Sequence, residues 1–428
     1  MQTLSPEVLT QIEDALVQKA VAQYGLALDL LFFDTTNCYT YVDDEHPENE
    51  LFQYGHSKEK QVHRRLFGVA LLVTRQGTVP LYHHTYPGNQ HDSRQFPKLL
   101  KTLCSRLERI GLTPEQVTLV FDRGNLSQDN FEILDDKKLG FVTALRLGDI
   151  PRELFDLPLQ HSKILKRGEK KGLRYFVKTI SLWGHERKAV FYVSESAKHY
   201  QIQQLNDALD RKLVELQQWN DSLRNQGGSD NTPTDRDIAK RIAALQYGPY
   251  LKEILSISYN PSLAPGERLQ YRVNEKAKAD IVSKYFGKRC LISNRMDWDA
   301  HKIVDAYFSQ AHVERAFRLA KDRHHISLRP QFHWTDQSVR AHTFSCFLAL
   351  LLGQLLLRKA QKIDSSITST PQLLDNLSKI RLAAVSSINF KSPQLAWKIE
   401  ALDLSSQKLL QALAPAQCFQ YSNKKVSS

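Results

Sequence analysis

Three acidic side chains, far apart in the sequence, have the types and positions needed for metal-dependent chemistry. Asp34 ends the apolar run LALDLLFFD, Asp122 ends the run VTLVFD, and Glu314 lies in a helical pattern that begins near Trp298. If they meet at the carboxyl end of a sheet, their like charges require cations to neutralise them. Carboxylate oxygens are ligands that Mg²⁺ prefers. Two such ions, roughly 3.5 to 4 Å apart, can activate the attacking oxygen and stabilise the leaving oxygen of a phosphodiester.

Each acid also has an ordinary explanation. An aspartate at a strand end commonly caps a turn or a helix. Glu314 has Arg318 four residues later, which is the spacing of a surface ion pair on a helix. Spacing alone leaves both explanations open.

The helical pattern around Glu314 places other polar side chains on one face. For one continuous helix over 298–325, with about 100° per residue, Tyr307, Gln310, Glu314 and Lys321 fall within an arc of about 60°. A single acid flanked by a phenol, an amide and an ammonium group is unusual for a helix face that contacts only water. This face is therefore a candidate part of the site.

The surrounding pattern predicts the elements that must position these residues. Strands of antiparallel character are followed by alternating helices and strands, which is typical of a mixed α/β sheet. The predicted segments are a helix at 5–24, strands at 26–34, 66–74 and 79–86, a helix at 93–110, a strand at 117–122, a helix at 127–138 and a strand at 140–145.

One α/β domain interrupted by an insertion is predicted. Its first part is 1–145, its second part is 266–360, and 361–428 is a C-terminal helical segment and tail. The insertion, 146–265, contains a hairpin around Trp183 and a long helix at 201–225, and strands at 269–273 and 288–293 are expected to resume the sheet. The apolar run 344–357 is too short for a comfortable membrane span, so it is predicted to be a buried helix covering the sheet.

The composition indicates a folded protein with a polyanionic partner. The chain has 58 Lys and Arg against 46 Asp and Glu, a net charge of +12, and residues 1–60 carry three lysines and eleven acids, so the excess falls on the later segments. Its five cysteines contain no Cys-x2-Cys pair, which argues against a zinc knuckle or a disulfide framework. The first residues do not have the pattern of a secretory signal.

Over about residues 25–360 the chain resembles the DDE transposases of bacterial insertion sequences, in particular the IS-four-like group. FDTTNCYT around Asp34 resembles the first-Asp motif, LVFDRGNLS around Asp122 the second, and HVERAFRLAKDRHHISLRP around Glu314 the third motif. The segment YGHSKEKQVHRRLFGVALLVTRQGTVPLYHHTYPGNQHDS, which includes Lys58, is similar to the Gly-His-Ser-Lys to Gly-Asn segment of that group.

The resemblance implies an RNase H-like fold with a β-rich insertion and a transposase that cuts DNA at element ends and joins the 3′-hydroxyl to a target. Asp34, Asp122 and Glu314 would be catalytic and would hold two Mg²⁺ ions, which Mn²⁺ can replace. The implied DNA-binding residues are Tyr307, Gln310, Arg318, Lys321, Lys58 and Trp183. The implied partners are double-stranded DNA at the element ends and target, and a second copy of the chain in a homodimeric synaptic complex. The implied location is the bacterial cytoplasm, at the nucleoid, with no membrane.

Two departures from the group's pattern support alternatives. The group has Tyr-x2-Arg-x3-Glu-x6-Lys, whereas Gln310 replaces the arginine and lacks its charged bidentate fork. Asp34 is only 33 residues from Met1, which leaves no room for the usual end-recognising DNA-binding region. One alternative is a truncated, catalytically idle DNA-binding remnant, and another is an RNase H-like nuclease unrelated to transposition.

Two histidine groups and Trp183 have more than one interpretation. The histidines are His83, His84 and His91, and His324, His325 and His333. Zinc would need a convergent tetrahedral set, and because no cysteine joins either group, phosphate contact or a structural role is favoured. Trp183, at a predicted hairpin tip, could stack on an unpaired base or cover a small β core.

Overall fold

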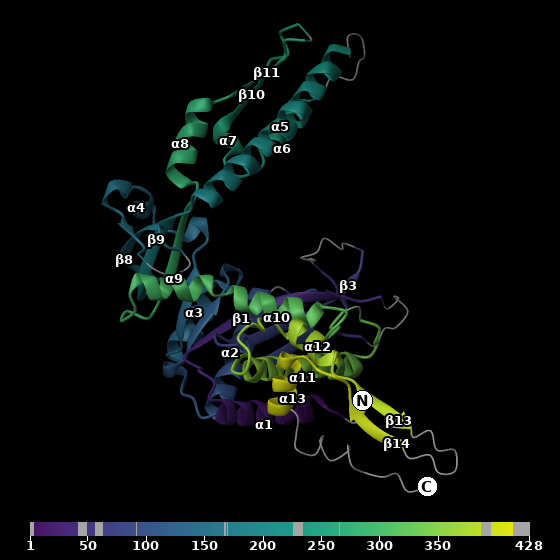
Figure 1. Ribbon diagram of the computed structural model, residues 1–428. Coiled ribbons are helices and arrows are strands. Elements are labelled where there is room, and N and C mark those ends of the chain that lie inside the picture. The colour runs from purple at the N-terminus through teal and green to yellow at the C-terminus, as the bar shows by residue number, and fades with distance from the viewer. Residues whose placement is uncertain are drawn as a thin grey trace. The chain divides into compact units, whose positions relative to one another are not determined.

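The computed structural model describes residues 4–41, 49–55, 63–90, 92–166, 168, 170–225, 234–264, 266–329, 331–386 and 395–413 (Figure 1). The chain divides into two compact units, which are described separately. Unit 1 comprises 1–143, 293–295 and 306–428, and unit 2 comprises 144–292 and 296–305.

Unit 1 is built on a mixed sheet. Its strands are β1 (Leu30–Tyr39), β2 (Gln53–Tyr54), β3 (Arg65–Thr74), β4 (Pro80–Pro87), β5 (Thr118–Phe121) and β6 (Gly140–Ala144). The order is β2-β3-β1-β5-β6, and β4 also pairs with β3. The pairs β1–β3 and β3–β4 are antiparallel, whereas β1–β5 and β5–β6 are parallel. The predicted mixed α/β sheet is therefore confirmed.

The helices of unit 1 cover both faces of this sheet. They are α1 (Pro6–Tyr24), α2 (Asp92–Arg109), α3 (Gln128–Asp136), α10 (Ala311–Lys321), α11 (Asp336–Gln361), α12 (Thr370–Ser378) and α13 (Leu404–Leu413). The Phe96 ring of α2 lies 5.4 Å from Phe33 of β1 and 4.9 Å from Phe121 of β5. On the other face, α10 packs on β1 and β3, and α11 packs on β4 and α10.

Local signals account for the ends of α1. The Ser5 side chain caps the helix by accepting a hydrogen bond from the Val8 N–H, and Pro6 occupies the first helical position, where its missing N–H costs nothing. Gly25 follows in the left-handed conformation, with φ 56°, which ends the helix. These residues explain why the prediction at 5–24 agrees with the structure.

The buried helix predicted at 344–357 lies within α11. By length and composition α11 is the one described helix that could cross a membrane, but 56% of its most apolar window is buried inside the protein. Phe344 and Phe347 pack against the His83 ring of β4, at 6.0 and 4.9 Å between centroids. These contacts are those of a core helix.

Unit 2 contributes further strands and has a second hydrophobic core. Strand order is β12-β9-β8-β7, and β10 pairs with β11 in a separate two-stranded sheet. The strands are β7 (Lys163–Ile164), β8 (Arg174–Leu182), β9 (His185–Val193), β10 (Leu255–Tyr259), β11 (Leu269–Val273) and β12 (Lys288–Ser293). The helices are α4 (Arg152–Phe155), α5 (Glu195–Asn225), α6 (Asp235–Leu245), α7 (Leu251–Ile254) and α8 (Glu275–Tyr285). The second core joins α5 to α6, α7, β10 and β11, so the long helix predicted at 201–225 has a mate within the chain.

Three expectations about the elements are wrong. The apolar run does not end a strand at Asp34, because β1 continues to Tyr39 through its pairing with β3. Strand 269–273 does not resume the main sheet, because it is β11 and pairs with β10. The C-terminal segment is not purely helical, since β13 (Leu382–Ser386) and β14 (Leu395–Ile399) form a hairpin within it.

The single helix expected around Glu314 is also wrong. The segment forms α9 (Ala300–Phe308) and α10, and the hydrogen bonds from Gln310 N to Tyr307 O and from His312 N to Ser309 O replace continuous helical bonding between them. Asp299 does cap α9, since its carboxylate accepts a 2.7 Å hydrogen bond from the Lys302 N–H. The common arc of Tyr307, Gln310, Glu314 and Lys321 therefore does not apply across the break.

Candidate active site

Asp34 and Asp122 lie on neighbouring strands and point to the same face of the sheet. The parallel register of β1 and β5 ends with Phe33 opposite Phe121. The next residue is Asp34 on β1 and Asp122 directly after β5. Phe33 and Phe121 both contact Phe96 of α2. Because successive side chains alternate and Asp122 is still extended (φ −77°, ψ 155°), both carboxylates face away from α2.

The backbone holds each carboxylate in a similar way. Oδ1 of Asp34 accepts a 2.7 Å hydrogen bond from the Thr35 N–H, and Oδ1 of Asp122 accepts a 2.8 Å bond from the Arg123 N–H. Asp122 also caps the short 3₁₀ helix at Arg123–Asn125. Asp34 is half-buried and Asp122 is exposed. Each aspartate is thus oriented locally while the sheet sets its position.

Helix α10 lies over the face to which the two aspartates point. The His312 ring packs on Phe32, at 5.7 Å between centroids, and Lys321 Nζ donates a 2.8 Å hydrogen bond to Thr36 Oγ1. Phe32 and Thr36 are each two residues from Asp34 along β1, so all three side chains lie on the same side of the strand. Asp34 therefore faces α10 between these two contacts.

Glu314 lies on an exposed flank of α10. The buried face of the helix consists of Val313, Ala316, Phe317 and Ala320. The flank with His312 faces α11 and α12, with which it lines a cavity. Glu314 is about 160° from His312 around the helix axis and about 20° from Lys321, so it projects from the opposite, exposed flank.

The donor chemistry of these acids suits a hard divalent cation, but the three are not gathered into one ligand set. Carboxylate oxygens on adjacent strands match the ligands Mg²⁺ prefers. Within the described part of the chain, no three His, Cys, Asp or Glu side chains lie close enough together to hold a metal ion. The structure thus pairs Asp34 with Asp122 and leaves Glu314 on the neighbouring helix.

The other residues predicted to bind DNA occupy different positions around α10. Lys321 is half-buried and its Nζ also donates a 3.0 Å bond to the Asn37 carbonyl, so the ammonium group is held beside β1. Tyr307 belongs to α9, and Gln310 lies in the break with helical backbone angles and no capping bond. Arg318 is exposed on the flank toward α12.

Two predicted DNA contacts lie elsewhere. Lys58 is outside the described residues. Trp183 sits in unit 2 at the tip of the β8–β9 hairpin, where Leu182 pairs with His185 and both Trp183 and Gly184 have positive φ, 50° and 79°. Such angles are those of a two-residue type I′ turn. The predicted hairpin tip is confirmed.

The histidines have structural partners. His83 is paired with the buried carboxylate of Glu13, His325 lies 3.2 Å from Asp322, and the rings of His333 and His342 are 5.1 Å apart. His91 is outside the described residues. These contacts favour the structural interpretation over a zinc site for the described histidines.

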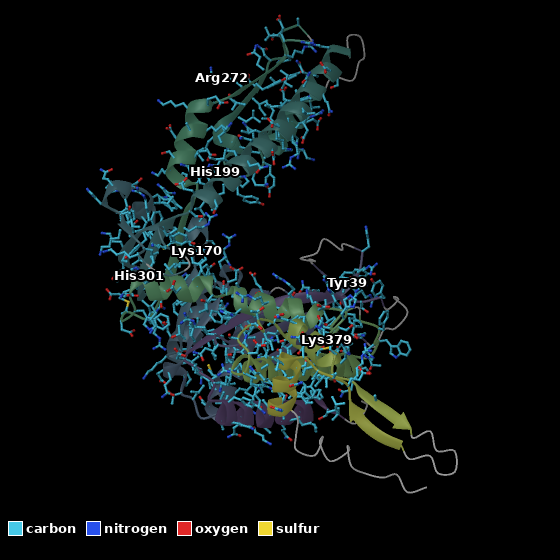
Figure 2. The ribbon with its side chains drawn as sticks, in the orientation of Figure 1. Tyr39, Lys170, His199, Arg272, His301 and Lys379 are labelled. Carbon is cyan, nitrogen blue, oxygen red and sulfur yellow. The ribbon has the colours of Figure 1, made fainter. Side chains whose placement is uncertain are left out.

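A cluster of aromatic rings and arginines near the end of β1, in which Tyr41 and Phe332 are exposed, was not predicted from the sequence. Tyr41 stacks on Phe332 at 6.0 Å, the Arg64 guanidinium lies 4.2 Å above the Tyr41 ring, and Arg329 lies 5.7 Å from the Tyr39 ring (Tyr39 is labelled in Figure 2). A hydrogen bond with Arg64 lowers the pKa of Tyr41. Tyr39 and Tyr41 follow Asp34 closely in the sequence, and the bridge between Thr40 and Gln331 brings the segment of Arg329 and Phe332 beside them.

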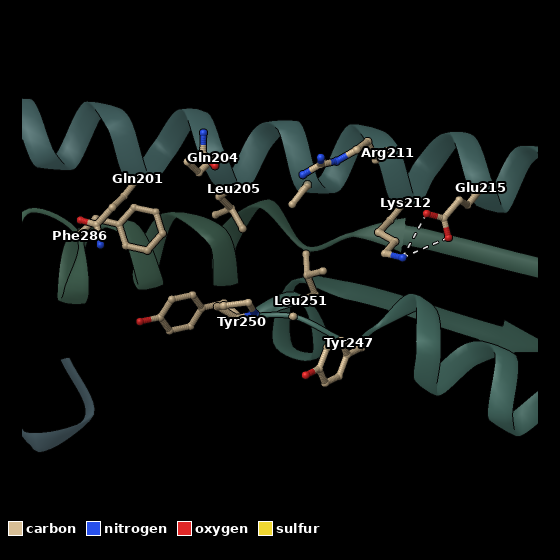
Figure 3. A pocket seen from close by; sticks show the side chains of 13 residues that line it. Gln201, Gln204, Leu205, Arg211, Lys212, Glu215, Tyr247, Tyr250, Leu251 and Phe286 are labelled. Atoms are coloured by element: carbon tan, nitrogen blue, oxygen red, sulfur yellow. Dashed lines mark hydrogen bonds and ion pairs between the residues drawn. The ribbon is translucent and has the colours of Figure 1, made fainter. Parts of the chain in front are cut away.

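A larger pocket, of about 540 Å³, lies in unit 2 and contains none of the predicted site residues (Figure 3). Leu205, Leu251 and Phe286 line it together with the exposed Tyr247. On its rim Lys212 Nζ pairs with both carboxylate oxygens of Glu215 at 3.2 and 3.1 Å. Its apolar lining belongs to the second core and provides no metal ligands for phosphodiester chemistry.

The fold and the paired aspartates define an α/β protein with a candidate acidic site, and the family comparison is specific. The family model for the transposase DDE domain matches residues 42–352, so the chain belongs to that family. Asp122 and Glu314 lie within the match, and Asp34 lies just before it. Members of the family generally use divalent metal ions.

Comparison with solved structures and curated sequences adds little further. The chain is similar to the cryo-EM structure of the piggyBac transposase synaptic complex with hairpin DNA, with 8% identity and a TM-score of 0.39, over 81% of this chain and 51% of that chain. It thus spans about half the length of that solved protein. No curated protein matches the sequence.

Proposed function

We propose that this protein is a transposase that cleaves DNA strands at the ends of an insertion element and transfers the 3′-hydroxyl ends to target DNA. The observation that carries the proposal is the β1–β5 register, which puts Asp34 and Asp122 side by side facing α10 in a member of the transposase DDE-domain family. We infer that the sheet of unit 1 is of the RNase H-like type and that unit 2 corresponds to the insertion. The IS-four-like motifs of bacterial insertion elements support this assignment.

Asp34, Asp122 and Glu314 are proposed to hold two Mg²⁺ ions, with Mn²⁺ as a substitute. When bound, such ions activate the attacking oxygen and stabilise the leaving oxygen of the phosphodiester. Asp34 and Asp122 turn toward the face of the sheet that α10 covers, and α10 carries Glu314 on an exposed flank. We propose that Glu314 completes the ligand set only when metal and DNA bind, because the three carboxylates repel one another without cations.

The proposed partner is double-stranded DNA, at the element ends and at the target, held by two copies of the chain in a synaptic complex. Lys321, held beside β1, and Tyr307 would contact phosphates near the acids, and Gln310 would donate a neutral hydrogen bond where the group has arginine. Arg318, Lys58 and Trp183 are further proposed contacts. The exposed Tyr41, Phe332 and Trp334, together with Arg64, supply stacking surfaces and positive charge of the kind that binds unpaired bases.

The test is cleavage of a supercoiled plasmid that carries the DNA flanking the gene, in Mg²⁺ or Mn²⁺. The variants are Asp34→Asn, Asp122→Asn and Glu314→Gln, which keep side-chain volume and remove the charge. Each is expected to lower nicking by roughly a hundredfold or more, because a lost metal ligand removes several kcal/mol of transition-state stabilisation. Glu108→Gln is the matched control, since Glu108 is an exposed acid on α2, the opposite face.

The outcomes separate the alternatives. If any one of the three acids can be neutralised with full cleavage retained, the catalytic assignment is wrong. A wild-type protein that shifts DNA but never nicks it in either metal is an idle binding remnant. Cutting without joining of 3′ ends to a second DNA identifies a nuclease unrelated to transposition.

A further inference from the structure

A polar cavity lies in unit 1, beside the flank of α10 that carries His312, Arg315 and Arg318. Its volume is about 400 Å³, and it is formed by α10, the end of α11, the start of α12 and the turn between β3 and β4. The lining contributes hydroxyl groups from Thr78, Thr368 and Thr370, and the amide of Gln354. These hydroxyl and amide groups can donate hydrogen bonds to an anion.

Two guanidinium groups make the cavity electropositive. Arg315 and Arg318, both exposed and three residues apart on α10, line it. At that spacing the two side chains leave the same face of the helix. Two arginines on one wall form a fork-shaped set of donors that matches the oxygens of a phosphate group.

The acid in the cavity is already engaged. Asp322 Oδ1 accepts a 2.9 Å hydrogen bond from the His324 N–H, and Oδ2 lies 3.2 Å from His325 Nδ1. The bond from His324 is the main cause that lowers the pKa of Asp322, so the carboxylate stays charged and bound to its own loop. It offsets one of the two arginine charges and leaves the cavity with a positive balance.

The N-terminus of α12 opens onto the same cavity. The Ser369 side chain caps the helix by accepting from the Gln372 N–H, at 3.3 Å, and Pro371 has no N–H. The N–H of Thr370, the first helical residue, has no partner within the helix. A nine-residue helix thus directs the positive end of its dipole and one N–H toward the space beside the arginines.

An independent observation indicates a missing ligand. Thr370 is 4% exposed and its hydroxyl has no hydrogen-bond partner among the described residues. The methyl group of Thr370 lies toward Gly353 of α11, so the side chain is fixed by packing. A buried hydroxyl without a partner is unfavourable, and a polar ligand in the cavity would remove that cost.

The backbone turn on the other wall is held in an unusual conformation. Thr78, a β-branched residue, has φ 53°, follows Gly77 at φ 77°, and lies with its hydroxyl 3.4 Å from His312 Nδ1. A β-branched residue rarely adopts this region, and such conformations persist where the surrounding structure enforces them. The turn therefore forms a fixed wall rather than a loose loop.

We propose that this cavity is a phosphate-binding site in which Arg315, Arg318 and Thr370 hold a phosphate group. The group is either a backbone phosphate of DNA or a free inorganic phosphate, since both present the same oxygens. The first source rests on the proposed function, because it places a DNA strand along the flank of α10 that carries Arg315 and Arg318. The second source does not depend on transposition.

The first experiment is calorimetric titration of the full chain with sodium phosphate at constant ionic strength set with sodium chloride. Wild-type protein is expected to bind phosphate, and Arg315→Ala or Arg318→Ala to weaken binding about tenfold or more, as expected for a charged hydrogen bond. Lys101→Ala is the matched control, because Lys101 is an exposed cation on α2, on the opposite face of the sheet. It is expected to leave binding unchanged.

Thr370→Val separates binding from folding, because it keeps the shape of the side chain and removes the hydroxyl. Without phosphate the variant is expected to melt at the wild-type temperature or higher, since a buried hydroxyl without a partner has been removed. Its phosphate affinity is expected to fall about threefold to tenfold. A lower melting temperature with unchanged phosphate affinity would indicate a purely structural role and would count against the site.

The DNA arm measures binding of a short duplex as a function of salt for wild type and Arg315→Ala. If the group is a DNA phosphate, the variant loses affinity equally for all sequences, the salt slope falls by about one, and free phosphate competes. If DNA binding is unchanged while phosphate binding is lost, the site takes free phosphate, and the result leaves the transposase proposal untouched. Absence of phosphate binding by wild type, or equal binding by all variants, overturns the inference.

Discussion

Replacing Glu13 with glutamine tests the packing that positions the aspartates. Glu13 is 1% exposed on α1, and its carboxylate pairs with His83 of β4 and with Arg106 of α2. The backbone N–H of His83 also donates a 3.1 Å hydrogen bond to the Glu13 carboxylate. The buried carboxylate of Glu13 thus joins α1 to β4 and to α2. Strand β4 belongs to the same sheet as β1, which carries Asp34.

The expected loss of stability follows from the partners left behind. Removing one member of a buried ion pair costs about 3 to 5 kcal/mol, because the other charge stays buried. Arg106 keeps Asp14 at 3.1 Å and lies 4.6 Å from the Tyr82 ring centroid, so we expect the lower end, about 3 kcal/mol at pH 7. For a unit of this size that lowers the melting temperature by roughly 6 to 12 °C.

The pH dependence gives the sharper result. Burial by itself raises the pKa of Glu13, but His83 and Arg106 lower it more, so the net pKa lies below the usual 4.5. Since the folded state binds its proton less tightly than the unfolded state, the stabilisation is complete above about pH 4.5 and is lost as the pH falls through the folded pKa. Glu13→Gln has no such titration, so the stability gap to wild type should shrink below about pH 4.5.

The assay is urea denaturation of both proteins from pH 8 to pH 3, followed by circular dichroism. Burial lowers the pKa of the nearby His84 to about 4, so both proteins should lose stability between about pH 6.5 and 4. The Glu13 charge is the weakest of the influences on that pKa and raises it, so this loss should be similar in the two proteins and the gap below about pH 4.5 reports on Glu13. Asp129→Asn, an exposed carboxylate on α3, is the control. A Glu13→Gln variant within 1 kcal/mol of wild type at pH 7, or a gap that does not change with pH, would refute the reasoning.

Three further predictions follow from the structure. Trp183→Asn should stabilise unit 2 by about 0.5 to 1 kcal/mol in denaturant titrations, because asparagine tolerates the positive φ of the type I′ turn. The same variant should bind DNA more weakly if Trp183 stacks on a base. Lys321→Met should lower plasmid nicking more than DNA affinity in gel shifts, since the ammonium group is held against Thr36 and Asn37 of β1, the strand that carries Asp34; equal losses would contradict that role. In the Cys418→Ser variant, the thiols of the folded protein should stay unreactive to a disulfide reagent at pH 8. The reason is that burial raises the pKa of Cys290 and Cys346 to about 12. Fast labelling of these thiols would show that the core is open to the reagent.

Local patterns in the sequence were sufficient for most elements of unit 1. The helix at the N-terminus has a serine cap and a terminal glycine, and the β3–β4 hairpin has two apolar runs separated by Arg-Gln-Gly. The Trp183 hairpin was also visible, because the strands on each side alternate and a glycine follows. Such signals depend on neighbours in the chain, so no knowledge of the tertiary structure is needed to read them.

The longer-range features required the fold. The end of β1 was misjudged because pairing with β3 extends it beyond the apolar run, to Tyr39. The break before α10 leaves no clear sequence signal, since Ser309 and Gln310 do not forbid a helix. Strand 269–273 looks like any sheet strand, and only the second core of unit 2 decides that it pairs with β10.

The sequence by itself determined which residues are candidates, because the two aspartates follow apolar strands and the motifs around them match a transposase family. It did not determine where their side chains point. That was decided by the packing of Phe96 against Phe33 and Phe121, which fixes the face to which the next residue on each strand must turn. The position of Glu314 depends likewise on the angle at which α10 packs over β1. The orientation of a strand face or a helix flank is set by contacts between segments distant in the chain, and local propensity carries no information about them.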